Sequence, residues 1–505
     1  MKKFPIFVLF VALFFSLLAG CEGIDDVSSD PNLRLRFSVD TLSFDTVFST
    51  VGSTTKTFLV YNPNREALKI ERIELAGAGA GGFRINVDGR KGTEFQDINI
   101  WQKDSLFISV EVTVHPNDAT QPFVIEDSVL FYTNGVRQSV LLQAYGQNVH
   151  IIRGGVTLAK DTMLAADLPY LVYDSLMVGE GVTLTLEKGV RFYMHNRAKL
   201  LIYGTIKAIG EQESPVIIRG DRLDNIEAEV SFPYDRTPGQ WDGISFASSS
   251  YDNELDYVII RNGVSGLLFH PSDPERIKIR IRNSQITNMD ENLLVATDCR
   301  MEVAGSEFTN AAGAVVSLTG GIYQFTHCTI ANYKKVLGNS REFTPCLTLS
   351  NTVKNDEAET LHPLQQASFD NCIIDGNFSA DSMLSYRGEI LFDTQTETEI
   401  QGDDATFNYR FNSCLVKTAR VENSRFLNCL FVQSALYLKN GTKDEFFEYD
   451  FRLANESPGI GRADRSIAEQ YPVDRYGVSR IEGETAPSIG AYEYVYQEPS
   501  EKDKK

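Results

Sequence analysis

Positive charge is scarce in this chain of 505 residues. Its 48 lysines and arginines stand against 68 aspartates and glutamates, which gives a formal net charge of −20. A surface that binds nucleic acid needs a stripe or patch of basic side chains. We therefore predict that the protein has no nucleic-acid partner.

Histidine is also scarce, and none of the histidines shows the spacing of metal ligands. The chain has no repeat of the calcium-binding Gly-Gly-x-Gly-x-Asp type. We therefore predict no metal site and no cofactor. The six histidines are His115, His150, His195, His270, His327 and His362.

Long helical stretches are missing after residue 20. Short runs of Val, Ile, Leu and Phe are instead broken by Gly, Asn and Asp, which is the pattern of strands and turns. The length favours two or three domains. These observations predict an all-β protein.

The first residues have the composition of a targeting segment. Lys2 and Lys3 precede an apolar run from Phe4 to Leu18, which is too short for a confident membrane span. The run ends in Leu18-Ala19-Gly20-Cys21, which resembles the bacterial lipobox. The resemblance implies that residues 1–20 are a signal peptide and that Cys21 carries lipid as the first mature residue. An ordinary signal peptide followed by a chance cysteine is the alternative.

The residues after Cys21 are acidic. Glu22, Asp25 and Asp26 look like the surface-export tether of Bacteroidetes-type lipoproteins, and the alternative is a simple solvated linker. We expect residues 21–34 to form a flexible tether. The resemblance implies a protein anchored by lipid in the outer membrane, facing either the periplasm or the cell surface.

Residues 35–148 read as a first β-domain of about seven strands. Leu42, Phe44 and Phe48 alternate with polar neighbours, which indicates strands with one buried face. Asn134-Gly135 is a strong hairpin signal. The motifs Phe44-Asp45-Thr46-Val47, Phe58-Leu59-Val60-Tyr61-Asn62-Pro63 and Ala144-Tyr145-Gly146 resemble immunoglobulin-like domains related to those of Hydin. The resemblance implies a β-sandwich that serves as a spacer or a binding module.

A repeat dominates the second part of the chain. Each copy reads apolar, two residues, small, one residue, apolar, one residue, Asn, and the step is 22 residues from Ile281 to Val303 and again to Phe325. The next match, Phe369, follows after 44 residues, twice 22. The small positions include Ser284, Ser306, Cys328, Cys372, Cys414 and Cys429, and the polar positions are Asn262, Asn288, Asn310 and Asn332.

A period near 22 fits one coil of a β-solenoid, in which equivalent residues stack on successive coils. The small residues would then form one inward ladder, and the asparagines a second ladder at a corner with left-handed backbone. Ordinary exposed Asn turns are the alternative. A leucine-rich repeat has the same period but lacks support here. The cysteines are expected to be buried thiols, because disulfide geometry is demanding.

Several further motifs resemble right-handed parallel β-helix proteins of the pectin-lyase-like superfamily. They are Leu186-Glu187-Lys188-Gly189-Val190, Leu201-Ile202-Tyr203-Gly204-Thr205-Ile206 and Gln240-Trp241-Asp242-Gly243-Ile244. The resemblance implies a right-handed single-stranded parallel β-helix over residues 149–435, with Trp241 in its core.

The C-terminal motifs Ser457-Pro458-Gly459-Ile460, Asp474-Arg475-Tyr476-Gly477 and Ile489-Gly490-Ala491-Tyr492-Glu493 look like the choice-of-anchor segment that closes many envelope β-helix proteins. We expect residues 436–496 to cap the solenoid end, which would otherwise expose unpaired backbone. Residues 497–505 are charged and are expected to be disordered.

Chemistry on the β-helix is hard to find in the sequence. Arg276-Ile277-Lys278 and Gly402-Asp403-Asp404 match tripeptides of polygalacturonase-type enzymes, but in the reverse order. A basic stripe that would suit an acidic glycan is conceivable if its members share one face, and neutralisation by nearby carboxylates is the alternative. Its members would be Arg191, His195, Arg197, Arg219, Arg261, Arg280 and Arg282.

The leading hypothesis is therefore a non-catalytic, lipid-anchored envelope protein that presents a rigid β-helix to a polysaccharide or an envelope protein. One rival is a polysaccharide lyase or glycoside hydrolase that acts on acidic polysaccharide. The other is a structural or adhesive surface protein. A cleft that gathers Asp or Glu with Lys or Arg would favour the enzyme.

Overall fold

The structure is a computed structural model that describes residues 27–226, 232–334, 344–354, 359–380, 388–394, 406–419, 423–441 and 448–498. The predicted signal peptide, Cys21 with the first acidic residues, and the charged end of the tail lie outside these residues. The chain divides into two compact units, residues 1–149 and 150–505.

The N-terminal unit consists of two sheets that share one core. Phe58 of one sheet meets Phe131 of the other with ring centroids 6.3 Å apart, and both side chains are buried. One sheet contains β1 (Val27–Ser28), β3 (Thr41–Phe48), β5 (Ala67–Leu75), β8 (Glu94–Ile100), β10 (Phe123–Thr133) and β11 (Val136–Gln147). The other contains β2 (Arg36–Phe37), β4 (Lys56–Tyr61), β6 (Phe83–Val87), β7 (Arg90–Gly92) and β9 (Ser105–Val112).

The predicted hairpin in this unit is confirmed. Strands β10 and β11 pair antiparallel up to Thr133 and Val136, and Asn134 and Gly135 form the turn. Both turn residues have positive φ, 50° and 74°. A two-residue turn of this kind matches the twist of the flanking strands, which is why Asn-Gly is favoured there.

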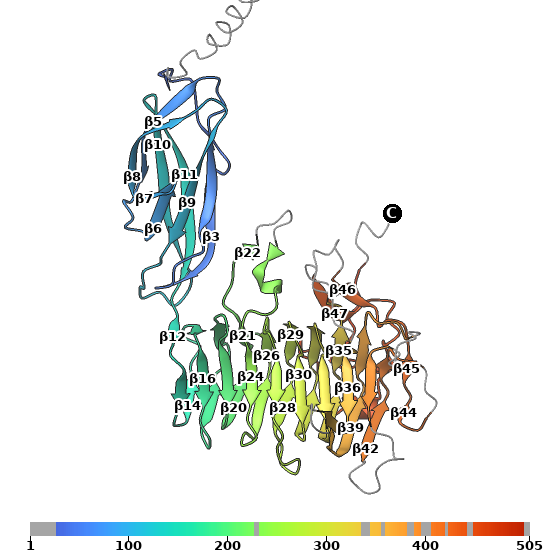
Figure 1. The fold of residues 1–505 in the computed structure, drawn as a ribbon. Coiled ribbons are helices and arrows are strands. Elements are labelled where there is room, and N and C mark those ends of the chain that lie inside the picture. Colours follow the sequence, from blue (N-terminus) through green and yellow to red (C-terminus); the bar gives the residue numbers. More distant parts are fainter. Residues whose placement is uncertain are drawn as a thin grey trace, which may run out of the picture. The chain divides into compact units, whose positions relative to one another are not determined.

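The second unit is a parallel β-helix, as predicted, and Figure 1 shows its coils stacked one upon the next. Three long parallel sheets run along it. The 11-stranded sheet contains β12 (His150–Ile152), β15 (Tyr170–Val172), β18 (Arg191–Met194), β21 (Val216–Gly220), β26 (Val258–Arg261), β29 (Gln285–Met289), β32 (Glu307–Ala311), β35 (Thr329–Asn332), β40 (Ile373–Gly376), β43 (Leu415–Val416) and β45 (Leu430–Phe431).

The other two long sheets complete each coil. The nine-stranded sheet contains β13 (Val156–Leu158), β16 (Ser175–Val178), β19 (Lys199–Ile202), β24 (Gly243–Phe246), β27 (Leu267–Phe269), β30 (Leu294–Thr297), β33 (Val316–Thr319), β36 (Leu347–Ser350) and β41 (Ile390–Asp393). The ten-stranded sheet contains β14 (Thr162–Leu164), β17 (Thr183–Leu186), β20 (Thr205–Ile209), β25 (Asn253–Asp256), β28 (Ile279–Arg282), β31 (Arg300–Ala304), β34 (Gly321–Thr326), β39 (Leu364–Asp370), β42 (Phe407–Asn412) and β44 (Phe426–Leu427).

Side chains of one kind stack inside the helix because equivalent residues pair from coil to coil. Phe325, Phe369, Phe411 and Phe426 pair in this order, with ring centroids 5.2, 4.8 and 4.8 Å apart. A fully buried Phe contributes roughly 1.5–3 kcal/mol of transfer free energy. The aromatic stack therefore ties together coils that bury little apolar surface alone.

The small repeat residues lie at the corner between the ten-stranded and the 11-stranded sheet. The N–H of Ser284 donates to Ser306 Oγ at 3.1 Å, and the N–H of Cys328 donates to Cys372 Sγ at 3.4 Å. The residue before each of them has positive φ, for example Asn283, Gly305 and Asn371. A serine or cysteine thus bridges two coils at this corner, and the six cysteines of the β-helix unit, including Cys414 and Cys429, are free thiols.

The asparagine positions do not all behave alike. Asn262, Asn288 and Asn310 have positive φ, whereas Asn332 does not. Asn332 Nδ2 donates to the carbonyl of Ala311 on the neighbouring coil. Asn262 and Asn288 instead donate to carbonyls of residues 235–237. The expected ladder along the helix axis is therefore interrupted by an inserted loop.

The step of 44 residues is one coil, not two. Phe325 pairs directly with Phe369, so no complete coil lies between them. This coil carries long excursions, one of which includes the hairpin of β37 (Thr352–Lys354) and β38 (Glu359–Leu361). The cost of closing a flexible loop rises only slowly with its length, so a coil tolerates such insertions.

The C-terminal segment covers a flank of the β-helix. It contains β46 (Tyr437–Asn440), β47 (Tyr449–Leu453) and α2 (Arg465–Ala468). Its Ile489 and Leu453 pack on outward side chains of the 11-stranded sheet such as Ile373 and Leu415. Tyr476 reaches as far back as Gln212, whose Nε2 donates to the Tyr476 carbonyl at 2.9 Å. An apolar outer face of the β-helix therefore receives this segment, and its role as a cap of the solenoid end stays a prediction.

His327 is buried because of this arrangement. It is 0% exposed, and its Nε2 lies 3.0 Å from Asn371 Nδ2. Asn371 in turn accepts the N–H of Asp464 and donates to the Asp464 carbonyl. Burial, helped by the nearby Arg480 guanidinium, lowers the pKa of His327 well below its ordinary value.

We expect the stability of the β-helix to fall with pH below about 6.5, the ordinary pKa of histidine. The unfolded chain binds a proton there that folded His327 resists, so the free energy of unfolding decreases by up to about 1.4 kcal/mol per pH unit. His327→Asn removes this contribution and suits the corner, since Asn283 and Asn371 occupy equivalent places. Thermal unfolding at pH 7.5 and 5.5 measures it. His115→Asn in the N-terminal unit is the control, and parallel profiles of wild type and His327→Asn would contradict the prediction.

Candidate functional site

The three outer faces of the β-helix differ in charge. On the ten-stranded sheet, the central outward row alternates Lys207, Glu254, Arg280 and Glu302, and neighbours in it form ion pairs at 3.3 and 2.9 Å. The 11-stranded sheet is covered over β32, β35 and β40, where both faces are buried. The outer face of the ten-stranded sheet is therefore charged along this row, and the outer face of the 11-stranded sheet is covered over these three strands.

The nine-stranded sheet has an uncharged central row on its outer face. Its members pair in register from the first strand to the last and are at least partly exposed. They are Thr157, Met177, Leu201, Ser245, Leu268, Val295, Ser317, Thr348 and Leu391. Charged side chains make up 23% of the chain, so an uncharged row over nine strands is a distinct surface.

A hollow of about 450 Å³ lies on this face. Strands β19 and β24 and the turns that follow β16, β19, β24 and β27 supply its lining. Tyr203 is 37% exposed, and Glu180 is the one carboxylate among the lining residues. The lining consists of Glu180, Leu201, Tyr203, Ser245, Ala247, Ser248, Ser249 and His270.

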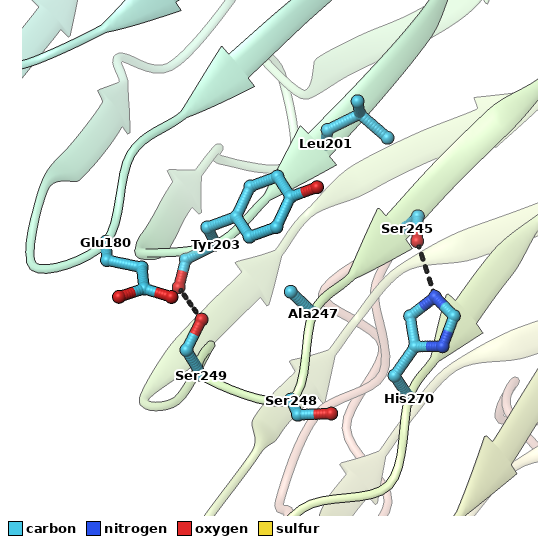
Figure 2. A pocket seen from close by; sticks show the side chains of 8 residues that line it. All are labelled: Glu180, Leu201, Tyr203, Ser245, Ala247, Ser248, Ser249 and His270. Atoms are coloured by element: carbon cyan, nitrogen blue, oxygen red, sulfur yellow. Dashed lines mark hydrogen bonds between the residues drawn. The ribbon is translucent and has the colours of Figure 1, made fainter.

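Figure 2 shows how these side chains are arranged. The rings of Tyr203 and His270 lie on opposite sides of the small Ala247. Ser245 Oγ is 3.1 Å from His270 Nε2, and Ser249 Oγ donates to the Tyr203 carbonyl at 3.0 Å. The hollow therefore combines an aromatic ring, several hydroxyl groups and an imidazole.

A buried lysine lies behind the hollow. Lys278 is 0% exposed, and its Nζ donates to the carbonyl of Ala247 at 2.5 Å. Burial lowers the pKa of Lys278 to about 8. The neighbouring Cys299, whose Sγ contacts the His270 carbonyl at 3.6 Å, has its pKa raised by burial to about 11. A strongly perturbed lysine beside a hollow is typical of functional sites, although structural networks also produce it.

A second, more polar groove of about 390 Å³ lies on the 11-stranded sheet. One wall is the insertion that contains β22 (Asn225–Ile226), β23 (Phe232–Pro233) and η1 (Tyr234–Arg236), and the other is β46 and β47. Its basic side chains are paired: Arg236 and Lys439 with Glu448 at 2.7 and 2.5 Å, and Arg261 with Asp235 at 3.0 Å. The groove thus holds basic and acidic groups that neutralise each other.

The structure does not bring the seven predicted basic residues into one stripe. Arg191, Arg219 and Arg261 lie on strands of the 11-stranded sheet, with His195 and Arg197 in the turn after β18. Arg280 and Arg282 lie on the ten-stranded sheet. Most have acidic partners: Asp235 for Arg219 and Arg261, Asp221 for His195, Glu302 for Arg280 and Glu254 for Arg282.

The tripeptides shared with polygalacturonase-type enzymes do not form a site in the described part of the chain. Arg276 stacks on the ring of Tyr251 at 4.0 Å, and Lys278 is buried. Asp403 and Asp404 lie outside the described residues. Among the residues that the structure describes, no group of three or more His, Cys, Asp and Glu is placed to hold a metal ion.

Sequence reasoning missed Tyr203, Ser245 and His270 as site residues. Tyr203 was visible only within a β-helix motif, and His270 only as a histidine without metal-ligand spacing. Ser245 and Leu268 pair across β24 and β27, so the register of the nine-stranded sheet was the needed information. The insertion between β21 and β24 shifts that register by an amount that no repeat in the sequence reveals.

Comparisons with known proteins leave the family open. No family model matches the chain. "Protein bark beetle" of Drosophila melanogaster is 33% identical over 141 residues, which are 27% of this chain, and the chain spans about 4% of the length of that relative.

Among the solved structures that align with this chain, three have TM-scores of 0.16 to 0.18. A family 28 exopolygalacturonase of Yersinia enterocolitica is 10% identical over 73% of this chain and 85% of its own, with a TM-score of 0.18. The ASH/PapD-like domain 7 of human CEP192 is 9% identical over 26% and 95%, with a TM-score of 0.17. A family 123 glycoside hydrolase of Clostridium perfringens is 8% identical over 23% and 26%, with a TM-score of 0.16. The fold of this chain accordingly follows from its own strand pairing.

Proposed function

We propose that this protein is a lipid-anchored envelope protein whose β-helix binds an uncharged glycan in the hollow beside Tyr203. The observation that carries the proposal is the combination in this hollow of an exposed aromatic ring with hydroxyl groups on an uncharged sheet face. An immunoglobulin-like N-terminal domain would act as the spacer between the anchor and the β-helix.

The chemistry of the hollow suits a sugar. A sugar ring has an apolar face of C–H groups and a rim of hydroxyls. Tyr203 offers a rigid apolar ring with a polar tip, which costs little conformational entropy to fix. Ser248 and Glu180 offer an exposed hydroxyl and a carboxylate for the rim. A largely preformed cavity with a few placed polar groups is the usual form of a small-ligand site.

The charge pattern favours a neutral glycan over an acidic one. No lysine or arginine lines the hollow, and Glu180 would repel a uronate. Most of the seven predicted basic residues already have carboxylate partners, so a polyanion would have to displace them. The overall charge of −20 adds long-range repulsion.

Binding without turnover of the glycosidic bond agrees best with the carboxylates of this surface. Glycosidases use a pair of carboxyl groups across the bond that they cleave. The hollow has one carboxylate. Of the four that line the polar groove, Asp235, Glu448 and Asp450 lie in ion pairs, and Glu307 accepts hydrogen bonds. Turnover of uronate polymers would support the rival proposal of a polysaccharide lyase or glycosidase.

We expect Tyr203→Ala to weaken binding of neutral oligosaccharides by at least about tenfold, roughly 1.4 kcal/mol. The loss follows from removing the ring on which the sugar packs. A glycan array identifies the ligand, and calorimetry on wild type and variant measures the affinity. Tyr496→Ala, at a tyrosine that is 63% exposed and lies outside the hollow, is the matched control. Equal affinities of Tyr203→Ala and wild type would exclude the hollow as the site.

Lipid attachment makes a separate prediction. We expect Cys21→Ser to abolish incorporation of radiolabelled palmitate and to move the protein from the membrane to the soluble fraction. Each buried methylene of an acyl chain contributes roughly 0.8 kcal/mol, so loss of all chains removes the anchor. The cysteines of the β-helix serve as internal controls, and Cys429→Ser should stay labelled. Unchanged labelling of Cys21→Ser would show that another residue carries the lipid. No helix in the described ranges is long and apolar enough to span a membrane.

A further inference from the structure

The hollow contains a hydroxyl and an imidazole in hydrogen-bonding contact. Ser245 Oγ and His270 Nε2 are 3.1 Å apart, which is within the 2.6–3.2 Å reach that a general base needs to take a proton from an alcohol. Figure 2 shows this pair on one side of Ala247 and the Tyr203 ring on the other, and all four residues line the same hollow. A substrate held against the Tyr203 ring would therefore lie beside this pair.

The two residues are well supported by the sheet. Ser245 lies in the middle of β24, and Leu268 opposite it pairs in register two residues before His270. The His270 N–H donates to the carbonyl of Phe246 at 3.0 Å, which fixes the backbone of His270 against β24. Groups on strands are positioned more rigidly than groups on free loops.

Two groups at the hollow can offset a negative charge that develops on the ester oxygen, against the repulsion from the Glu180 carboxylate in the lining. The ammonium group of Lys278 lies behind the floor, on the carbonyl of Ala247. It is desolvated, so its field is screened less than that of a surface lysine. The hydroxyl of Ser248 lines the hollow and is available as a donor to an oxyanion.

We propose that Ser245 and His270 act as nucleophile and general base of an esterase that removes acyl groups from hydroxyls of the bound glycan. The sugar part of this substrate rests on the proposed function, whereas the reactivity of Ser245 does not. Both residues would touch the ester.

The reaction balances with water as the second reactant. Ser245 Oγ bonds to the ester carbonyl carbon while its proton moves to His270 Nε2. The bond from that carbon to the sugar oxygen then breaks, and the sugar oxygen takes the proton from His270. Water, deprotonated by His270, next attacks the acyl-serine, and the carboxylic acid leaves as Ser245 regains its proton.

The missing carboxylate sets the expected rate. None of the described residues places a carboxylate within hydrogen-bonding distance of His270. Disabling the corresponding aspartate in a serine protease lowers kcat about 10⁴-fold. Slow turnover is therefore expected, and covalent labelling of the serine is a better readout than steady-state rates alone.

The test uses the full-length protein with a fluorophosphonate probe and with 4-nitrophenyl acetate. We expect mass spectrometry to locate the phosphonate on Ser245, and Ser245→Ala to lose both labelling and acetate release. His270→Asn should slow labelling by about 10²-fold or more, the usual contribution of a general base. Ser317→Ala is the matched control, because Ser317 occupies the same outward row on β33 outside the hollow and should leave both readouts unchanged.

The outcomes separate this inference from the proposed function. A phosphonate on another residue, no labelling at all, or acetate release by Ser245→Ala at the wild-type rate would overturn the esterase. Glycan binding by wild type together with an unlabelled Ser245 would leave the binding proposal standing alone. Labelling of Ser245 in a protein that binds no glycan on the array would support the esterase activity and contradict the proposed glycan binding.

Discussion

Hydrogen bonding between successive coils is the constraint on which the second unit depends. Parallel strands stack at roughly 4.8 Å, so a residue fixes what its equivalents above and below can be. Phe325, Phe369 and Phe411 stack for this reason. Ser306 Oγ accepts the N–H of Ser284 on the neighbouring coil, at a corner where the backbone turns through positive φ. The same constraint acts outside the helix, where the ten-stranded sheet alternates charges that would repel each other if they were alike.

Covering segments decide which outer face remains for function. The apolar side chains of the C-terminal segment pack on Ile373 and Leu415 of the 11-stranded sheet. It buries Glu307, whose carboxylate accepts hydrogen bonds from Tyr492, Gln285 and Thr309. The 11-stranded sheet is thus occupied by the chain itself, and the ten-stranded sheet is occupied by its own ion pairs. The nine-stranded sheet is left with an uncharged row, and the hollow lies on it.

Features that depend on the repeat or on short local motifs were predicted from the sequence. Features that depend on the inserted and covering segments were missed. The β-solenoid and the Asn134-Gly135 hairpin follow from local patterns, because each depends on residues close in the chain, and the core position of Trp241 was implied by the family resemblance. The burial of His327 and the single long coil before Phe369 depend on segments distant in sequence. Tyr203, Ser245 and His270 belong to this second kind: each looks ordinary alone, and only the register brings them together.

The position of Ser245 matters for how the hollow works. A serine in the middle of a paired strand cannot move toward a substrate, so the substrate must be brought to it by Tyr203 and the hydroxyl rim. Binding and chemistry would then draw on the same rigid frame, and holding a reactant in place converts an intermolecular step into an effectively intramolecular one. Lys278 lies beneath this frame: burying an ammonium costs free energy, burial lowers its pKa to about 8, and its Nζ donates to the Ala247 carbonyl. The ammonium is held on the carbonyl of a residue that lines the hollow, so the same contact that satisfies Lys278 places its charge next to the proposed chemistry.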